Sequence, residues 1–211
     1  MKKKFVLIIL FVFPLVVYLF FASGVTNFGR LPVITEDIGE LDQLDSSERF
    51  SGKISILGFL GEDLELKKTN AFNLNQKIYK RFYEFTDFQM LMVVPVGTEE
   101  KVESLKKELS TLADTRNWKF IYATETEIRQ LFDALNTDLV LDEYLSSPYV
   151  FIIDKERNLR GRNDDENNGL KYGFNATSVA DINNKMVDDV KIILAEYRLA
   201  LKKRKSAGDN P

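Results

Sequence analysis

The side chains that most often carry chemistry in proteins are missing from this chain. Its 211 residues include no cysteine and no histidine. A Ser-His-Asp triad, a Cys-His pair, a CxxC redox couple and the usual zinc or copper sites each require an imidazole or a thiolate. The chemistry that remains is that of carboxylate, lysine, tyrosine or serine side chains, or of oxygen ligands for hard cations.

Four groups of residues could still act as ligands or reactive groups: the acidic loops at residues 61–65 and 164–168, the methionines Met90 and Met92, and the hydroxyl cluster Ser146, Ser147 and Tyr149. Carboxylates at a helix start act as caps, and the second loop lacks the spacing of an EF-hand. Strand methionines are usually core residues, and no base near the hydroxyl cluster is apparent. We expect no catalytic residue, no metal site and no cofactor.

The elements that must position these groups form an alternating pattern. Short apolar segments predict strands, and apolar residues at spacings of three and four predict helices between them. The expected strands cover residues 54–60, 88–96 and 118–123, and the expected helices cover residues 72–85, 99–112 and 128–135. A hairpin of residues 149–153 and 159–162 follows, and then a terminal helix from about Ser178. The alternation is typical of parallel βαβ units in one α/β domain.

The N-terminal residues 1–24 predict a membrane anchor. Residues 5–22 contain no charged side chain and follow three lysines. A spanning helix needs about 20 apolar residues, whereas the apolar part of a secretory signal usually has about 7 to 15. The positive-inside rule then places the N-terminus in the cytoplasm and the domain on the periplasmic or extracytoplasmic side. The small residues around Ala22 leave a cleaved secretory signal as the alternative.

Three further regions complete the predicted organisation: a linker with a short hairpin at residues 25–50, the domain at residues 51–203 and a disordered tail at residues 204–211. The formal net charge of −3 gives no field that would attract nucleic acid. The basic run Lys202–Lys205 finishes the predicted terminal helix, where cations interact favourably with the last carbonyl groups. A surface or lipid contact is the alternative role for this run.

Framework residues outside the four groups have a recognisable order. They are Leu31-Pro32, Gly39, Gly52-Lys53 before an apolar strand, the segment at residues 147–154 and Gly161. This order, behind one N-terminal anchor, resembles the Sco/SenC-like branch of the thioredoxin-like superfamily, whose membrane-tethered members serve copper-site assembly in cytochrome oxidase. The resemblance implies a thioredoxin-like three-layer α/β sandwich with an N-terminal β-hairpin extension. It also implies a cis peptide bond before Pro148.

The resemblance does not extend to the family's metal ligands. Family members carry Cys-x-x-x-Cys after the first core strand and a histidine before the later hairpin strand, and strand register places these positions at Leu64, Lys68 and Ser146. These side chains cannot bind copper as two thiolates and an imidazole do. The resemblance therefore implies a non-catalytic binding or assembly factor. Its candidate partner surface is Glu62, Asp63, Glu65 and Ser147. The alternative is a copper or thiol-linked accessory in oxidase assembly that borrows ligands from a partner protein.

Overall fold

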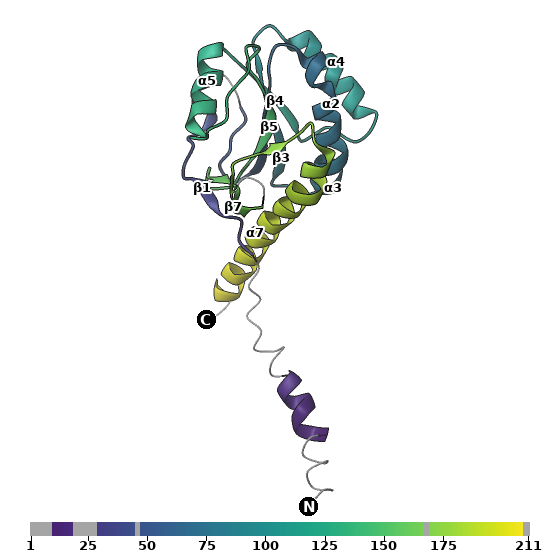
Figure 1. Ribbon diagram of the computed structural model, residues 1–211, viewed down its shortest axis with the longest axis vertical. Helices are drawn as coiled ribbons and strands as arrows, with labels where there is room; N and C mark the ends of the chain where they lie inside the picture. The colour runs from purple at the N-terminus through teal and green to yellow at the C-terminus, as the bar shows by residue number, and fades with distance from the viewer. Residues whose placement is uncertain (1–9, 19–28, 45–46, 167–168, 209–211) are drawn as a thin grey trace, which may run out of the picture.

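The computed structural model describes residues 10–18, 29–44, 47–166 and 169–208. Within them, the main sheet has seven strands in the order β1-β6-β5-β2-β3-β4, and β9 pairs with β5 (Figure 1). Strands β2, β3 and β4 are parallel, whereas β5 is antiparallel to β2. The strands are β1 (Val33–Thr35), β2 (Ile54–Leu60), β3 (Phe88–Pro95), β4 (Trp118–Ala123), β5 (Ser146–Ile153), β6 (Leu159–Arg160) and β9 (Phe174–Asn175). A separate ribbon pairs β7 (Arg162–Asp165) with β8 (Gly169–Lys171).

Helices follow β2, β3 and β4 in turn, and a long helix ends the domain, so the predicted alternation, hairpin and terminal helix are confirmed. Two π-helical segments, η2 and η3, lie inside longer helices. The helical elements are η1 (Leu41–Gln43), α2 (Leu64–Leu74), η2 (Asn75–Tyr79), α3 (Lys80–Phe82), α4 (Glu99–Ser110), α5 (Glu125–Ala134), α6 (Val179–Asp181), η3 (Ile182–Met186) and α7 (Val187–Gly208).

The sheet is buried on both faces. Ile54 and Ile56 of β2 lie in a core formed with α2, α4 and α7, whereas Leu57 and Phe59 lie in the opposite core with α5. Figure 1 shows α5 on one side of the sheet and α2, α3, α4 and α7 on the other. Strands covered on both faces are expected to be continuous apolar runs, as β2 and β3 are. The methionines of β3 are fully buried in the first core, which confirms their expected packing role.

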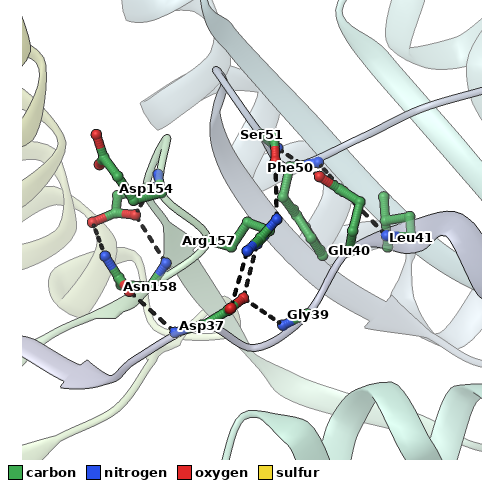
Figure 2. Close-up of polar contacts among 10 residues, drawn as sticks. Asp37, Gly39, Glu40, Leu41, Phe50, Ser51, Asp154, Arg157 and Asn158 are labelled. Carbon is green, nitrogen blue, oxygen red and sulfur yellow. Dashed lines mark hydrogen bonds and ion pairs between the residues drawn. The ribbon is translucent and has the colours of Figure 1, made fainter.

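The described part of the segment at residues 25–50 does not contain the predicted local hairpin. Strand β1 instead pairs antiparallel with β6, far along the chain. The turn between β5 and β6 holds this segment in place: the Arg157 guanidinium donates hydrogen bonds to Asp37 at 2.8 and 3.0 Å (Figure 2). The Ile38 N–H donates to the Arg157 carbonyl at 2.9 Å. The partner of β1 is therefore chosen by tertiary contacts, which a search for local turn residues does not detect.

Glu40 fixes the remainder of this segment. Its carboxylate accepts hydrogen bonds from the N–H groups of Leu41, Phe50 and Ser51 at 3.1, 2.6 and 2.9 Å (Figure 2). Burial by itself would raise the pKa of Glu40, but the bonds from Ser51, Phe50 and Leu41 outweigh it and hold the pKa below its ordinary value. One side chain thus closes the loop that leads into β2.

The peptide bond before Pro148 is trans, so the predicted cis bond is wrong. Strand β5 begins at Ser146, two residues earlier, so the proline lies inside an extended strand and not in the tight turn that usually holds a cis proline. Its carbonyl accepts a hydrogen bond from the Ala176 N–H at 2.8 Å. The strand pairing therefore sets the backbone here.

The structure describes part of the predicted anchor and part of the predicted tail. Residues 10–18 of the predicted anchor are helical, and its remainder lies outside the described residues. In the part that is described, no helix combines the length and apolar character needed to span a bilayer. Helix α7 continues to Gly208, so residues 204–208 are helical where a disordered tail was predicted. Residues 209–211 lie outside the described part.

Candidate functional site

The first acidic loop, at residues 61–65, lies between β2 and α2 and is fixed by backbone contacts. Gly61 has a φ of +69°, and a Cβ atom there would lie 2.3 Å from the Tyr144 carbonyl oxygen, so only glycine fits. The Glu62 N–H donates to the same carbonyl at 3.0 Å. Asp63 caps α2 by accepting a hydrogen bond from the Leu66 N–H at 3.3 Å. The expected capping role of this loop is confirmed, and the loop is joined to the residues before β5.

The first two of the three positions assigned to missing ligands now have structural roles. Leu64 is 2% exposed and packs in the core beneath α2. The Lys68 Nζ lies 2.5 Å from Glu108 Oε1 on α4 and 3.6 Å from Glu65 Oε2. The hydrogen bond to Glu108 raises the pKa of Lys68. An apolar side chain and an ion pair between two helices therefore occupy the two positions that the sequence predicts for the family's cysteines.

The third position, Ser146, belongs to a cluster with Asp142 and Lys67, which we call the Asp142 cluster. The Ser146 hydroxyl donates to Asp142 Oδ2 at 2.6 Å, and the Ser146 N–H donates to Oδ1 at 2.8 Å. Lys67 Nζ lies 3.2 Å from Oδ2. Burial would raise the pKa of Asp142, but the hydrogen bonds from Ser146 and Lys67 outweigh it and hold the pKa below its ordinary value. A carboxylate with a lowered pKa is a weak base, so the cluster is suited to joining α2 to β5 and not to activating a nucleophile.

The predicted partner surface is only partly available. Glu62 and Glu65 are exposed and Asp63 is half-buried. Ser147 is 5% exposed, and its Oγ accepts a hydrogen bond from the Tyr149 N–H at 3.1 Å. Ser147 therefore offers almost no surface to a partner, because its side chain is buried and hydrogen-bonded within β5.

Four large apolar side chains are exposed around the same end of the sheet, and we call them the edge patch. Leu66, Val96, Val140 and Tyr144 are between 46% and 78% exposed. Leu66 and Tyr144 flank the Asp142 cluster along the chain. Val96 precedes α4, whose Lys101 donates a hydrogen bond to the Glu62 carbonyl at 2.9 Å. These contacts bring the segments that carry Leu66, Val96 and Tyr144 together at the filled site.

The second acidic loop is tied to the domain at one residue. Asp165 is buried, and the Lys185 Nζ lies 2.5 Å from its Oδ2. Asp164 is exposed, and residues 167–168 lie outside the described part. Among the residues that the structure describes, no group of three or more Asp, Glu, His or Cys side chains is arranged to hold a metal ion.

Sequence reasoning did not identify three residues that close the site: Lys67, Glu108 and Asp142. Asp142 could have been found, because an aspartate in a loop often accepts a hydrogen bond from the N–H two residues on, as Asp142 does from Tyr144 at 3.0 Å. Glu108 gave no such signal, because it lies 40 residues from Lys68 and meets it only through the packing of α2 against α4.

Comparison with known proteins identifies the fold. No family profile matches the chain, and no curated protein matches it. Solved structures do match. BsSco, described as a member of the Sco family of cytochrome c oxidase assembly proteins with a disulfide switch, aligns with a TM-score of 0.51 and 12% identity over 76% of this chain and 95% of BsSco. The chain has the fold of a Sco protein.

Other solved structures align with this Sco-like chain at lower TM-scores. Apo Sco1 from Thermus thermophilus aligns at 0.46, with 12% identity over 79% of this chain and 95% of that one. The thioredoxin domain of a thiol-disulfide oxidoreductase from Bacteroides vulgatus aligns at 0.40, with 16% identity over 64% of this chain and 86% of that one. The alignment with BsSco confirms the predicted thioredoxin-like α/β fold. The Sco-like chain nevertheless has no cysteine or histidine with which to bind copper or exchange disulfides.

Proposed function

We propose that this protein is a membrane-anchored, non-catalytic Sco-like domain that binds a protein partner outside the cytoplasm, in the manner of an assembly factor. The observation that carries the proposal is the filled site. Leu64 is buried in the core, and Lys68 and Ser146 are engaged with Glu108 and Asp142. A side chain that packs or bonds within the domain is not available for transfer chemistry, whereas the apolar residues around the site face solvent.

The surface around the edge patch indicates the chemistry of the partner. Glu62 and Glu65 are exposed beside Leu66, and the first turn of α4 adds Glu99 and Glu100. The contact from Lys101 to the Glu62 carbonyl brings that turn next to the loop. An apolar centre with a charged rim is the usual anatomy of a protein interface. We therefore expect the partner to present apolar residues flanked by lysine or arginine.

Anchoring is supported by the sequence. Residues 5–22 lack charge over a length sufficient for a bilayer, and the lysines before them favour a cytoplasmic N-terminus. The domain would then work on the extracytoplasmic side, where the length of the linker limits its reach to partners near the membrane.

Affinity purification of the full chain from detergent-solubilised membranes tests the proposal. A Leu66→Asp/Tyr144→Asp variant should lose about tenfold or more of the recovered partner, since such a loss corresponds to about 1.4 kcal/mol of binding free energy. A Leu112→Asp/Leu170→Asp variant is the control, because these apolar side chains are also exposed, at other places on the domain. Equal recovery from both variants, or no reproducible partner, would contradict the proposal.

The alternative is a copper or thiol-linked accessory that takes its ligands from the partner. The Sco fold is the observation that favours it. Metal analysis of the purified complex distinguishes the two functions: we expect no stoichiometric copper. One copper ion per complex, lost when Leu66 and Tyr144 are changed, would favour the alternative.

A further inference from the structure

The second half of α7 carries a charge opposite to that of the chain. Residues 197–208 contain five basic residues and no acidic one, whereas the whole chain has a net charge of −3. The basic residues are Arg198, Lys202, Lys203, Arg204 and Lys205. The helix dipole attracts cations only within about the last turn. Arg198 and Lys202 precede that turn, so the dipole does not account for them.

The acidic residues of the first half of α7 each have a basic partner before residue 197, although Glu196 shares Arg160 with Asp154 and Asp188 pairs with Lys191. Asp189 lies 2.7 Å from Arg162, and Glu196 lies 2.7 Å from Arg160. The remaining one, Asp188, accepts a hydrogen bond from a lysine one turn further along the same helix at 2.8 Å. The acidic side chains of the first half of α7 thus have basic neighbours within the domain, and residues 197–208 bring five basic residues and no acidic one.

Apolar surface lies beside the basic residues. A groove of about 290 Å³ runs between α7 and the end of α3, lined by Phe82, Phe85, Leu194, Ala195 and Leu199, with Lys191 and Arg198 at its sides. The Arg198 guanidinium lies over the Phe85 ring, 5.9 Å from its centre. Lys191, which also pairs with Asp188, and Arg198 lie seven residues apart, a spacing that places them on one helical face. A helix with a basic face beside an apolar face is typical of a helix that lies on a membrane surface.

Helix α7 lies beside the point where the chain enters the domain, as a membrane-surface helix behind an N-terminal anchor would. The Leu31 carbonyl accepts a hydrogen bond from Arg160 Nε at 2.8 Å, and the Arg160 Nη2 lies 2.7 Å from Glu196. The chain therefore enters the domain beside α7, and Figure 1 shows α7 leaving at the end where β1 enters. If residues 5–22 cross the membrane, the eight residues 23–30 allow at most about 30 Å between bilayer and domain. The segment at residues 197–208 is about 18 Å long.

We infer that residues 197–208 lie against anionic lipid headgroups and hold the domain on the membrane surface. The geometry of this inference rests on the anchor in the proposed function. Each basic residue near an anionic surface contributes roughly a fivefold gain in binding, and the attraction falls off over about 10 Å at moderate salt. Five basic residues in one segment therefore favour contact with an anionic surface.

The test uses the full chain reconstituted into vesicles of phosphatidylcholine with or without phosphatidylglycerol. Trypsin should cut at Lys202–Lys205 about tenfold more slowly in the phosphatidylglycerol vesicles, and high salt should remove the difference. Cleavage at Lys107, on a distant helix, is the internal reference. A Lys191→Gln/Arg198→Gln variant keeps the cleavage sites and should lose several-fold of the protection, whereas Lys77→Gln/Lys80→Gln should retain it.

The possible results separate the lipid contact of residues 197–208 from the N-terminal anchor. Equal cleavage in both vesicle types, for a chain that floats with both, would overturn the lipid contact and leave the anchor intact. A chain that floats only with anionic vesicles would support the contact and overturn the anchor. Flotation with neither would overturn both. Equal protection by soluble nucleic acid would assign the basic face to a polyanion other than lipid.

Discussion

At the scale of single residues, the site differs from a copper or thiol site in where its side chains point. Leu64 lies in the core, and Ser146 donates to Asp142 rather than facing a substrate. The sequence was enough to predict that copper ligands are missing from these positions. It was not enough to predict what replaces them, because burial and ion pairing depend on how α2 packs against α4 and β5.

Leu64→Ala should destabilise the domain by about 2–5 kcal/mol, because it removes a buried side chain and leaves a cavity under α2. Leu64→Met keeps most of the volume and should cost less than about 1.5 kcal/mol. Urea denaturation of both variants provides the measurement. A loss below about 1 kcal/mol for the alanine variant would mean that position 64 is not part of the core.

Asp142→Asn should reduce stability at neutral pH by about 1–3 kcal/mol, because it replaces an acceptor of several hydrogen bonds. The pKa of Asp142 is lower in the folded protein than its ordinary value of 3.8. Its stabilisation is therefore present above pH 3.8 and is lost as the pH falls through the folded-state pKa. The difference between wild type and variant should shrink over that range in urea titrations.

The matched change is Asp138→Asn, because Asp138 is an exposed neighbour on the same loop. It should alter stability by less than about 0.5 kcal/mol. A difference between wild type and Asp142→Asn that does not shrink at any pH below 3.8 would show that the carboxylate charge is not what stabilises the Asp142 cluster, since protonation removes that charge.

At the scale of elements, strands and helices of the core were predictable, and the parts that depend on distant contacts were not. The β2 and β3 segments are nearly continuous apolar runs because both sheet faces are covered. Helix α2 begins at Leu64, eight residues before the predicted start, because the Asp63 cap supports a first turn with few apolar residues. The predicted hairpin failed because β1 finds its partner in β6, and the predicted cis proline failed because β5 already begins at Ser146.

Glu40→Gln tests how the N-terminal segment is held. The new amide group would face the Ser51 N–H in place of an accepting oxygen, so stability should fall by about 1–2 kcal/mol. Hydrogen exchange should accelerate at the Phe50 and Ser51 amides, which bond to Glu40. Glu36→Gln, an exposed position nearby, should leave these amides unchanged. Unchanged exchange in the Glu40 variant would show that other contacts hold the loop.

At the scale of the whole molecule, the order of the strands and helices was enough to predict the fold. The proposed docking surface, the edge patch, could be recognised only from the three-dimensional structure. Leu66 follows β2, Val96 follows β3, and Val140 and Tyr144 both precede β5, so the pairing of these three strands brings three segments to one end of the sheet. The same end contains the filled site. The chain thus has the fold of a Sco protein, and the proposed docking surface is the edge patch.

Site-specific photocrosslinking from position 66 in native membranes tests this account most directly. With a photoreactive phenylalanine in place of Leu66, we predict one dominant adduct with a second protein, and its loss when Glu62 and Glu65 are changed to lysine. The same probe in place of Leu112 should give no such adduct. Equal adducts from both positions, or none from position 66, would contradict the claim that this edge is a docking surface.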